Sequence, residues 1–396
     1  MALLDKLFQL MAEKKASDIY ITAGAPIQIK IEGETLPINQ QLMVPAVIKQ
    51  MIYEMLSAEQ IARFERDKEL NLSFGRSEYG NFRTNLFWQR GSIAAVIRYI
   101  QGDIPSLESL ALPPVLSEVV MEKRGLVLVV GATGSGKSTT LASMLDHRSN
   151  NRSGHILTVE DPVEFLFKHR KSVVNQREVG IDTHSWHEAL RNAMRQAPDC
   201  ILIGEIRDRE TMEAAMAYSQ TGHLCLATLH ANNAYHALNR IVNFFPLENR
   251  PLLYLDLAVA LKCIVSQRLV RKPDGMRTPA VEILMNSRHV AELIERGELS
   301  EIKEAMEQSL TPGSRTFEQD LVRLYTEGTI DIDEAMANAD SPSNLSWLIN
   351  NAKSGKEEKE LAPAQSGPQA FEFQQTADDG TSFSEFALDL GDTPDR

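Results

Sequence analysis

The sequence contains few cysteines, and their spacing excludes the structures that cysteine most often builds. Cys200, Cys225 and Cys263 are the three cysteines in 396 residues, and no two of them form a CxxC pair. A disulfide framework needs an even number of cysteines, and a zinc ribbon needs closely spaced pairs, so neither is expected. We expect the three thiols to be small core residues.

The chain also lacks a long apolar run. No segment approaches the roughly 18 consecutive apolar residues that a membrane-spanning helix needs. The N-terminal segment MALLDKLFQLMAEKK has no small-residue cleavage site after an apolar stretch, so it does not resemble a signal peptide. We therefore expect a cytoplasmic protein.

Positive charge is in deficit. The chain has 41 Lys and Arg against 54 Asp and Glu, and its formal net charge is −13 at pH 7. Binding a nucleic-acid backbone requires an excess of Lys and Arg on some face of the protein. A large nucleic-acid interface is therefore not expected, although a local basic patch remains compatible with this charge.

The first part of the chain predicts a small α+β domain over residues 1–101. Hydrophobic residues at 43% and charged residues at 24% are typical of a globular protein, and the length predicts two domains with appendages. Short β-like runs separated by Gly and Pro turns surround one helical stretch near residues 47–64. The expected strands are Asp18–Thr22, Ile27–Ile31, Phe82–Trp88 and Ser92–Arg98.

A proline-containing segment, residues 102–114, predicts a linker, and the pattern changes after it. Over residues 115–350, apolar strands alternate with longer helical segments, which predicts an α/β domain with a parallel sheet covered on both faces. Helical patterns continue to about Asn350. The expected strands of this domain are Leu126–Val130, His155–Val159, Cys200–Ile203 and Leu224–Leu229.

The last segment, residues 351–396, differs in composition from the rest. It has four basic and ten acidic residues, a net charge of −6, and is rich in Gly, Ser, Gln and Pro. Such a segment buries too little apolar surface to offset its ordering entropy, so we expect a disordered acidic tail. Its phenylalanines leave two interpretations open, a solubilising tail or a partner-docking segment.

The sequence GATGSGKS matches the phosphate-binding P-loop motif and lies between an apolar strand and a helix-forming run. Glycines let successive backbone N–H groups approach phosphates, and the helix N-terminus adds a positive dipole. Lys137 is expected to reach the outer phosphates, and Ser138 to ligate Mg²⁺. The alternative is a Gly-rich turn with a surface lysine. The expected ATP-binding residues here are Gly131, Ala132, Thr133, Gly134, Ser135, Gly136, Lys137, Ser138 and Thr139.

Two further strands end in carboxylates. ILTVEDPVEF places Glu160 after one apolar strand, and CILIGEIRD places Glu205 after another. In an open parallel sheet the carboxyl ends of the strands share the edge that carries the P-loop. A carboxylate there could orient water or hold a metal, so Glu160 and Glu205 are both candidates. Gly204 stands where many P-loop enzymes have Asp.

Histidines flank the fourth strand, in TGHLCLATLH. His230 follows the strand at the ligand edge, where a neutral imidazole can sense a γ-phosphate. His223 precedes the strand, and for it a structural and a functional role are equally open. We include both among the candidate site residues.

Arginines form the last candidate group. Arg191 and Arg195 are four residues apart in a helical pattern, so they are expected on one helix face. Arg177 lies in NQREV, and Arg207 and Arg209 follow Glu205. Surface ion pairs explain some of these residues, but phosphoryl transfer also needs cations on the developing charge.

Taken together in this order, the segments resemble the PilT-like retraction ATPases of type IV pili, in the secretion ATPase superfamily, and within them the PilU group. The resemblance extends from Leu3 to about Asn350. It depends on ASDIYITAG, GATGSGKST, TVEDPVEF, NQREVG, RQAPD, ILIGEIRDRETM, TGHLCLATLHANNA and VSQRLV. As an ordered set these motifs are highly specific.

The resemblance implies a PAS-like N-terminal domain, a RecA-like ATPase domain and a homohexameric ring that uses ATP and Mg²⁺. It implies Glu160 as the catalytic glutamate, Glu205 as the metal-supporting acid and His230 as the γ-phosphate sensor. Arg83 and Arg98 become candidates to reach a neighbouring subunit's nucleotide. Expected partners are a PilT-like ATPase and the inner-membrane pilus platform protein, which would place the chain peripherally at the inner membrane, without nucleic acid.

Two departures bear on which function is expected. The helix HVAELIERGE stands where PilT proper has an AIR-type motif, and Ala197 stands where relatives carry Asp or Asn. Both fit PilU and favour an accessory motor working beside PilT over autonomous retraction. The paired CxxC insertion usual in pilus-assembly and type II secretion ATPases is missing. A RecA-like nucleic-acid motor and a nucleotide-gated ring with little turnover remain as alternatives.

Overall fold

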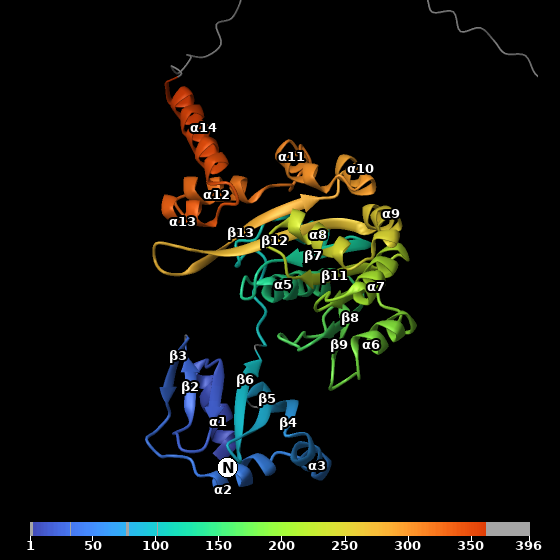
Figure 1. Cartoon of the computed structure of the whole chain (residues 1–396). Helices are drawn as coiled ribbons and strands as arrows, with labels where there is room; N and C mark the ends of the chain where they lie inside the picture. The colour runs from blue at the N-terminus through green and yellow to red at the C-terminus, as the bar shows by residue number, and fades with distance from the viewer. Residues whose placement is uncertain (1–2, 32, 77–78, 101, 362–396) are drawn as a thin grey trace, which may run out of the picture. The chain divides into compact units, whose positions relative to one another are not determined.

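The computed structural model describes residues 3–31, 33–76, 79–100 and 102–361 (Figure 1). The chain divides into two compact units, residues 1–349 and residues 350–396, and the first contains two separate sheets. Across the described ranges, no helix combines the length and the apolar character needed to cross a membrane.

The N-terminal region, coloured from blue to cyan in Figure 1, forms an antiparallel sheet with helices. The strands lie in the order β3-β2-β1-β6-β5-β4. Their bounds are β1 Asp18–Ile21, β2 Gln28–Ile31, β3 Glu34–Pro37, β4 Glu69–Arg76, β5 Gly80–Gln89 and β6 Ser92–Ile100, and the helices are α1 Leu3–Lys14, α2 Pro45–Tyr53 and α3 Ala58–Asp67. The buried rings of Phe8 and Phe82 lie 4.5 Å apart in its core. The four strands expected here are confirmed, and β3 and β4 are additional.

The single helix expected near residues 47–64 is wrong, because two helices occupy this stretch. Ser57 accepts a hydrogen bond from the backbone N–H of Gln60, and the Gln60 side chain accepts from the backbone N–H of Ser57. This reciprocal capping box satisfies backbone donors at a helix start, so α3 begins at Ala58 as a new helix.

The second sheet is the frame of the candidate site. Its strand order is β13-β12-β7-β11-β10-β8-β9. The strands are β7 Gly125–Val130, β8 Gly154–Glu160, β9 Ser172–Glu178, β10 Cys200–Ile203, β11 Leu224–Leu229, β12 Leu261–Arg271 and β13 Arg277–Met285. The helices are α4 Val115–Val119, α5 Lys137–Asn151, α6 Trp186–Ala193, α7 Arg209–Gln220, α8 Ala234–Asn243, α9 Arg250–Ala260, α10 Arg288–Arg296, α11 Ile302–Glu307, α12 Phe317–Thr326, α13 Ile332–Asn338 and α14 Pro342–Leu361.

Both faces of this sheet are buried, as expected. Every residue of β7 is buried, and alternate side chains enter two different cores. Leu126 and Leu128 join one core cluster, while Val127 and Val129 join the other. A strand covered on both faces gains from being apolar throughout, which explains the run LVLVV. The three cysteines are buried in β10, β11 and β12, which confirms their expected role as core residues.

The sheet is mixed, which corrects the expectation of a purely parallel one. The four expected strands pair in parallel, but β12 and β13 form an antiparallel pair where a helical pattern was expected. Strand β9 was not expected either. Within the segment expected to be a linker, Leu107 and Leu112 are buried against the second sheet's core.

The start of the acidic tail also differs from the expectation. Helix α14 continues to Leu361, so disorder beginning at residue 351 is wrong for residues 351–361. Residues 362–396, on which the rest of that expectation depends, lie outside the described residues.

Candidate functional site

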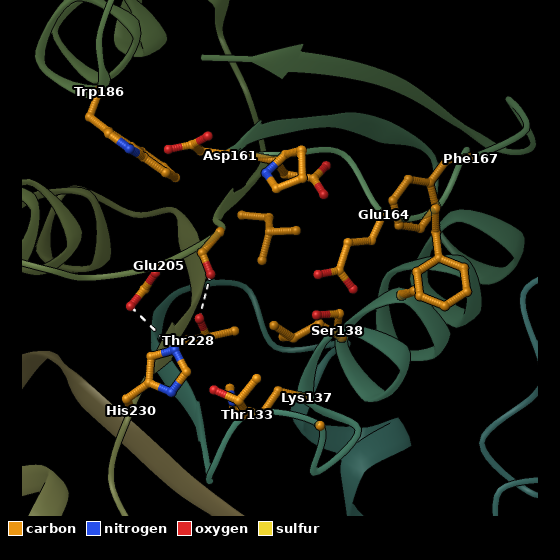
Figure 2. Close-up of a pocket in the computed structure, with 18 residues that line it drawn as sticks. Thr133, Lys137, Ser138, Asp161, Glu164, Phe167, Trp186, Glu205, Thr228 and His230 are labelled. Carbon is orange, nitrogen blue, oxygen red and sulfur yellow. Dashed lines mark hydrogen bonds and ion pairs between the residues drawn. The ribbon is translucent and has the colours of Figure 1, made fainter. Parts of the chain in front are cut away.

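A cavity of about 220 Å³ lies at the carboxyl ends of four strands, β7, β8, β10 and β11 (Figure 2). Its walls come from sequence segments that are far apart in the chain. The lining residues are Thr133, Gly134, Lys137, Ser138, Leu141, Ala142, Glu160, Asp161, Pro162, Glu164, Phe165, Phe167, Trp186, Leu202, Gly204, Glu205, Thr228 and His230. The parallel pairing of the strands brings these groups to one edge of the sheet.

Lys137 is held inside the P-loop. It is the first residue of α5, and its Nζ donates to the carbonyl oxygens of Gly131 and Ala132 at 2.9 and 2.8 Å. The side chain is buried, and this burial lowers its pKa, although Glu205 and Glu164 act in the opposite direction. A cation at a helix N-terminus that is already desolvated is well placed to neutralise a phosphate.

Two features of the loop test whether a phosphate fits. The Oγ of Ser135 is buried without a hydrogen-bond partner among the described residues, so the loop contains a polar atom that a ligand could satisfy. At Gly131 a Cβ would lie 2.4 Å from Ser135 Oγ and 2.5 Å from the carbonyl oxygen of Gln267. Only glycine lets the backbone at residue 131 lie so close to Ser135 and Gln267. A loop this compact fits around a polyphosphate.

Glu160, the last residue of β8, is almost fully enclosed. Thr158 Oγ1 and Gln176 Nε2 both donate to its Oε1, at 2.7 and 3.2 Å. Desolvation by burial raises its pKa to about 7, and these two hydrogen bonds oppose the rise. A carboxylate with a pKa near 7 can accept a proton from water at neutral pH.

Glu205 lies in a more polar and more open position. Arg207 Nε donates to Glu205 Oε2 at 2.7 Å, and Arg207 Nη1 donates to Asp161 at 3.3 Å. His230 Nε2 lies 3.4 Å from Glu205 Oε1, the contact drawn in Figure 2. Burial and Lys137 lower the pKa of His230, which favours the neutral imidazole.

Packing explains why glycine occupies position 204. A Cβ there would lie 3.2 Å from both the Cα of Glu160 and the carbonyl oxygen of Val159. These are backbone atoms of β8 and cannot move aside cheaply. A side chain such as Asp at residue 204 would therefore push against the residue that carries the Glu160 carboxylate.

The other candidate site residues do not line this cavity, although those of the P-loop lie next to it. Thr139 lies in the first turn of α5, one position beyond the cavity wall, and Ala132 and Ser135 lie in the P-loop beside it. His223 precedes β11, at the opposite end of the strand from His230, and bonds Thr221 and the Tyr218 carbonyl. The structure does not bring His223 to the site.

The candidate arginines are also placed outside the cavity. Arg191 is exposed on α6, and Arg195 lies beyond the end of that helix, where it donates to Asn192 at 2.9 Å. The expectation of one shared helix face is wrong, because α6 ends at Ala193. Arg98 donates to Asp18 at 2.8 Å, and Arg83 lies on β5. Their reach toward a neighbouring subunit stays a prediction.

Comparison with known proteins identifies the family. Residues 1–336 match the family described as Type II/IV secretion system protein. The chain belongs to this family. It is 45% identical to the Pseudomonas aeruginosa "Type IV pilus ATPase PilU", covering 87% of this chain and 91% of that protein. It is 37% identical to the "Type IV pilus retractation ATPase PilT" of the same organism, covering 86% and 99%.

Solved structures agree with this assignment. A crystal structure of the pilus retraction motor PilT with bound ADP matches with a TM-score of 0.82 and 40% identity, over 88% of this chain and 99% of that one. The ATPase DotB of Legionella pneumophila matches with a TM-score of 0.71 and 26% identity, over 85% and 95%. This secretion-family chain is an ATPase, and its resemblance to the PilT and PilU group is confirmed.

Several site residues of this secretion ATPase were not singled out from sequence. Thr158 and Gln176 hold the Glu160 carboxylate, and Thr140 Oγ1 donates to Gln267 Oε1 at 2.7 Å beneath the P-loop. Gln176 belongs to the motif NQREVG and Gln267 to the motif VSQRLV. These motifs support the family resemblance, but they assign no role to either glutamine. Glu164, another of the four carboxylates that line the cavity, follows Glu160 in the same motif.

Proposed function

We propose that this ATPase is the motor subunit of a homohexameric ring that retracts type IV pili, acting as a PilU-like accessory to a PilT-like ATPase. One observation supports this proposal above the others: Lys137, Glu160, Glu205 and His230 surround a single cavity beside the P-loop. The similarity to pilus ATPases over almost the whole length of those proteins supports the pilus assignment.

Within this proposal the four residues have separate roles. Lys137 neutralises the outer phosphates of ATP, and the neutral His230 donates a hydrogen bond toward the γ-phosphate. Glu160 accepts the proton of the attacking water, because its raised pKa makes it a stronger base than an exposed glutamate. Glu205 lies near both Arg207 and His230, so a change at the phosphate can reach it directly.

A magnesium ion would be held by the Ser138 hydroxyl and, through water, by Glu205. Mg²⁺ keeps several of its waters and usually binds through one or two protein groups together with substrate phosphates. The proposed pair of protein donors, the Ser138 hydroxyl and the Glu205 carboxylate, matches this preference, and both residues line the cavity. When bound, the ion neutralises charge on the phosphates.

The assembly and its partners are part of the proposal. We assign the region of the first sheet to a PAS-like domain over residues 1–101, joined by residues 102–114 to a RecA-like domain over residues 115–350. Arg83, Arg98, Arg191, Arg195 and His223 do not line the cavity of their own chain, which is consistent with a role toward a neighbouring subunit's nucleotide. The inner-membrane platform protein would hold the ring at the cytoplasmic face of that membrane.

The test is pilus retraction in cells whose own retraction ATPases have been deleted. We expect this chain to restore twitching motility when a PilT-like ATPase is also present, and not when it is the only retraction ATPase. Lys137→Ala is the matched control, because it removes a phosphate contact at the end of a buried side chain without removing a core residue. Restoration by Lys137→Ala, or no restoration by the wild type in either background, contradicts the proposal.

A further inference from the structure

Three consecutive side chains of β12 contact three different parts of the ATPase domain. Ser266, Gln267 and Arg268 belong to the motif VSQRLV. Gln267 accepts from Thr140 of α5, so it supports the P-loop helix. Arg268 contacts the loop that follows His230, and Ser266 contacts Glu282, which binds the end of that loop. The proposed function gives this loop no role.

Arg268 connects this loop to the C-terminal helices. Its Nη2 donates to the carbonyl oxygen of Asn232 at 3.3 Å and to Asp340 Oδ1, and its Nη1 donates to the carbonyl oxygen of Asn338. The guanidinium also lies 3.9 Å from the ring centroid of Phe317 in α12. A planar guanidinium held by several acceptors and an aromatic face has one preferred position.

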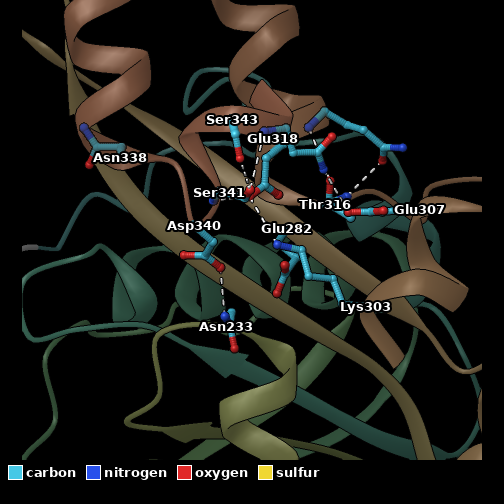
Figure 3. A network of polar contacts seen from close by, with 12 residues as sticks. Asn233, Glu282, Lys303, Glu307, Thr316, Glu318, Asn338, Asp340, Ser341 and Ser343 are labelled. Atoms are coloured by element: carbon cyan, nitrogen blue, oxygen red, sulfur yellow. Dashed lines mark hydrogen bonds and ion pairs between the residues drawn. The ribbon is translucent and has the colours of Figure 1, made fainter. Parts of the chain in front are cut away.

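Asp340 makes the second connection. Its Oδ2 accepts from Asn233 Nδ2 at 2.8 Å, as Figure 3 shows, while Oδ1 accepts from Arg268. Asp340 lies between α13 and α14, and Asn233 is the N-cap residue of α8. The carboxylate therefore joins the C-terminal helices to the residue at which α8 begins.

Glu282 fixes the next residue of the loop from the other side. It is only 4% exposed, and its Oε1 accepts from the backbone N–H of Ala234 at 2.8 Å and from Ser266 Oγ at 3.0 Å. Ser266 and Glu282 face each other across the β12–β13 pair. Three successive residues are thus held, Asn232 by its carbonyl oxygen, Asn233 by its side chain and Ala234 by its backbone N–H.

We propose that Arg268, Asp340 and Glu282 are positioning residues for His230, and that through them the C-terminal helices set how well the nucleotide site distinguishes ATP from ADP. We call these three residues the loop clamp. His230 follows β11 directly, and the clamped backbone begins two residues later. With both ends of so short a loop fixed, the imidazole has little freedom to leave the cavity.

The loop clamp couples the C-terminal helices to the nucleotide site, and because such coupling is reciprocal each affects the other. A movement of α13 and α14 that pulls Asp340 away from Asn233 would loosen His230 and weaken the response to a γ-phosphate. A triphosphate that holds His230 would in turn favour the closed clamp. This inference depends on the proposed role of His230 and assigns new residues to it.

The experiment measures equilibrium binding of ADP and of a non-hydrolysable ATP analogue, together with ATPase kinetics, on the full chain. Asp340→Ala is expected to weaken the analogue about tenfold while ADP affinity changes less than about twofold, because only the triphosphate reaches His230. The kcat should fall by about the same factor as analogue affinity. Asn233→Ser should give the same result, since serine keeps the helix cap but is too short to reach Asp340.

The decisive comparison uses the His230→Ala background. If the clamp acts through His230, Asp340→Ala added to His230→Ala should change analogue affinity by less than about twofold, because two groups in one chain of contacts are not additive. Equal losses for ADP and the analogue, or losses that multiply with that of His230→Ala, overturn the inference. These outcomes would indicate a structural role for Asp340.

Asn344→Ala is the matched control. Asn344 joins α14 to Glu307 of α11 through a 3.0 Å hydrogen bond, in the same group of helices but away from the loop. It should leave the ratio of the two affinities unchanged, and the same shift in this variant also overturns the inference. If the wild type binds both nucleotides but does not turn over ATP, the proposed function fails while the affinity ratio still tests the clamp.

Discussion

Glu160 ends β8 and Glu205 follows the neighbouring strand β10, at one edge of the sheet, yet their surroundings give them different properties. Glu160 is buried between Thr158 and Gln176, whereas Glu205 meets Arg207 and His230. A carboxylate that is buried with few charged neighbours gains basicity, and this describes Glu160. Residue position in the sequence could not separate the two roles, because the distinction comes from side chains contributed by β9 and by residue 207.

The first prediction concerns catalysis by these carboxylates. Glu160→Gln should bind Mg-ATP normally and lose hydrolysis by a factor on the order of 100, as expected for removal of a general base. Glu205→Gln should instead raise the Mg²⁺ requirement as well as slow turnover. In the wild type, kcat/KM should fall as the pH drops below about 7, where Glu160 takes up a proton. Steady-state kinetics over pH and Mg²⁺ concentration measure all three effects. The opposite pattern, with weak Mg-ATP binding only in Glu160→Gln, would exchange the roles.

Glu160 also predicts a pH-dependent stability. Its folded-state pKa of about 7 lies above the ordinary 4.5, so between these values the unfolded chain loses the proton first. The contribution of Glu160 to stability is therefore fully present below pH 4.5 and is lost as the pH rises through 7, by an amount on the order of 3 kcal/mol. Glu160→Gln should raise the melting temperature at pH 8 and change it little near pH 4.5. A lower melting temperature at pH 8 would show that the carboxylate does not strain the fold.

The second prediction concerns Ala197, which has φ 46° and ψ 53°. This left-handed conformation costs a residue with a Cβ roughly 1–2 kcal/mol, whereas Gly adopts it freely and Asn tolerates it. Ala197→Gly should stabilise the protein by about 0.5–1 kcal/mol in urea unfolding, with Ala197→Asn in between. The control is Ala291→Gly within α10, which should destabilise by a similar amount because its backbone is helical. Destabilisation by both substitutions would contradict the argument.

At the scale of the element, α5 has a second role besides presenting the P-loop. Arg148, in its last turn, is 1% exposed and donates from Nη1 to the carbonyl oxygens of Val120 at 2.6 Å and Glu122 at 3.0 Å. These carbonyls follow α4, where a helix C-terminus leaves acceptors unpaired. Burial lowers the pKa of Arg148, and the carbonyl dipoles stabilise its charge.

The third prediction follows from this contact. Arg148→Ala should lower the free energy of unfolding by about 3 kcal/mol, because it leaves one buried and one partly buried carbonyl without donors and creates a cavity. Arg288→Ala, which removes an exposed pair with Glu292, should change it by less than about 0.5 kcal/mol. Equal effects of the two substitutions in chemical denaturation would show that α4 needs no cap from α5.

The elements predicted correctly are those with clear local signals. Strands β7, β8, β10 and β11 are apolar runs bounded by turn residues, and their bounds agree with the sequence to within a residue or two. Strand β12 was missed because it begins at Leu261 directly after α9 ends at Ala260, without Gly or Pro between them. The capping box at Ser57 is a local sequence signal that separates α3 from α2.

The site was predictable as far as it depends on strand ends. Lys137, Glu160, Glu205 and His230 follow from the rule that parallel strands share one ligand edge. Gln176 and Gln267, which hold Glu160 and the P-loop helix in place, lie on β9 and β12. Which strands these two pair with is decided by tertiary packing and not by a local sequence pattern. His223 lies at the opposite end of β11 from that edge, so a role for it at a nucleotide stays a prediction.

At the scale of the whole molecule, the fourth prediction concerns the C-terminal segment. A chain ending at Leu361 should keep its ATPase activity and melting temperature, because the core residues of the last helix, Leu345 and Ile349, precede that point. A chain ending at Asp340 removes α14 and should lose stability. Loss of twitching with intact ATPase activity in the chain that ends at Leu361 would identify residues 362–396 as a partner-docking segment. Loss of ATPase activity there would contradict the prediction.

The position of the three cysteines has a practical consequence for following this protein in motion. Cys200, Cys225 and Cys263 lie within the central strands, and burial raises the pKa of each thiol far above its usual range. Thiolate is the reactive form of cysteine, so the folded native chain should not react with maleimide reagents. A single cysteine placed on α13 or α8 could then carry a fluorophore in the otherwise natural sequence. Slow labelling of the unaltered protein would report the opening of the sheet itself.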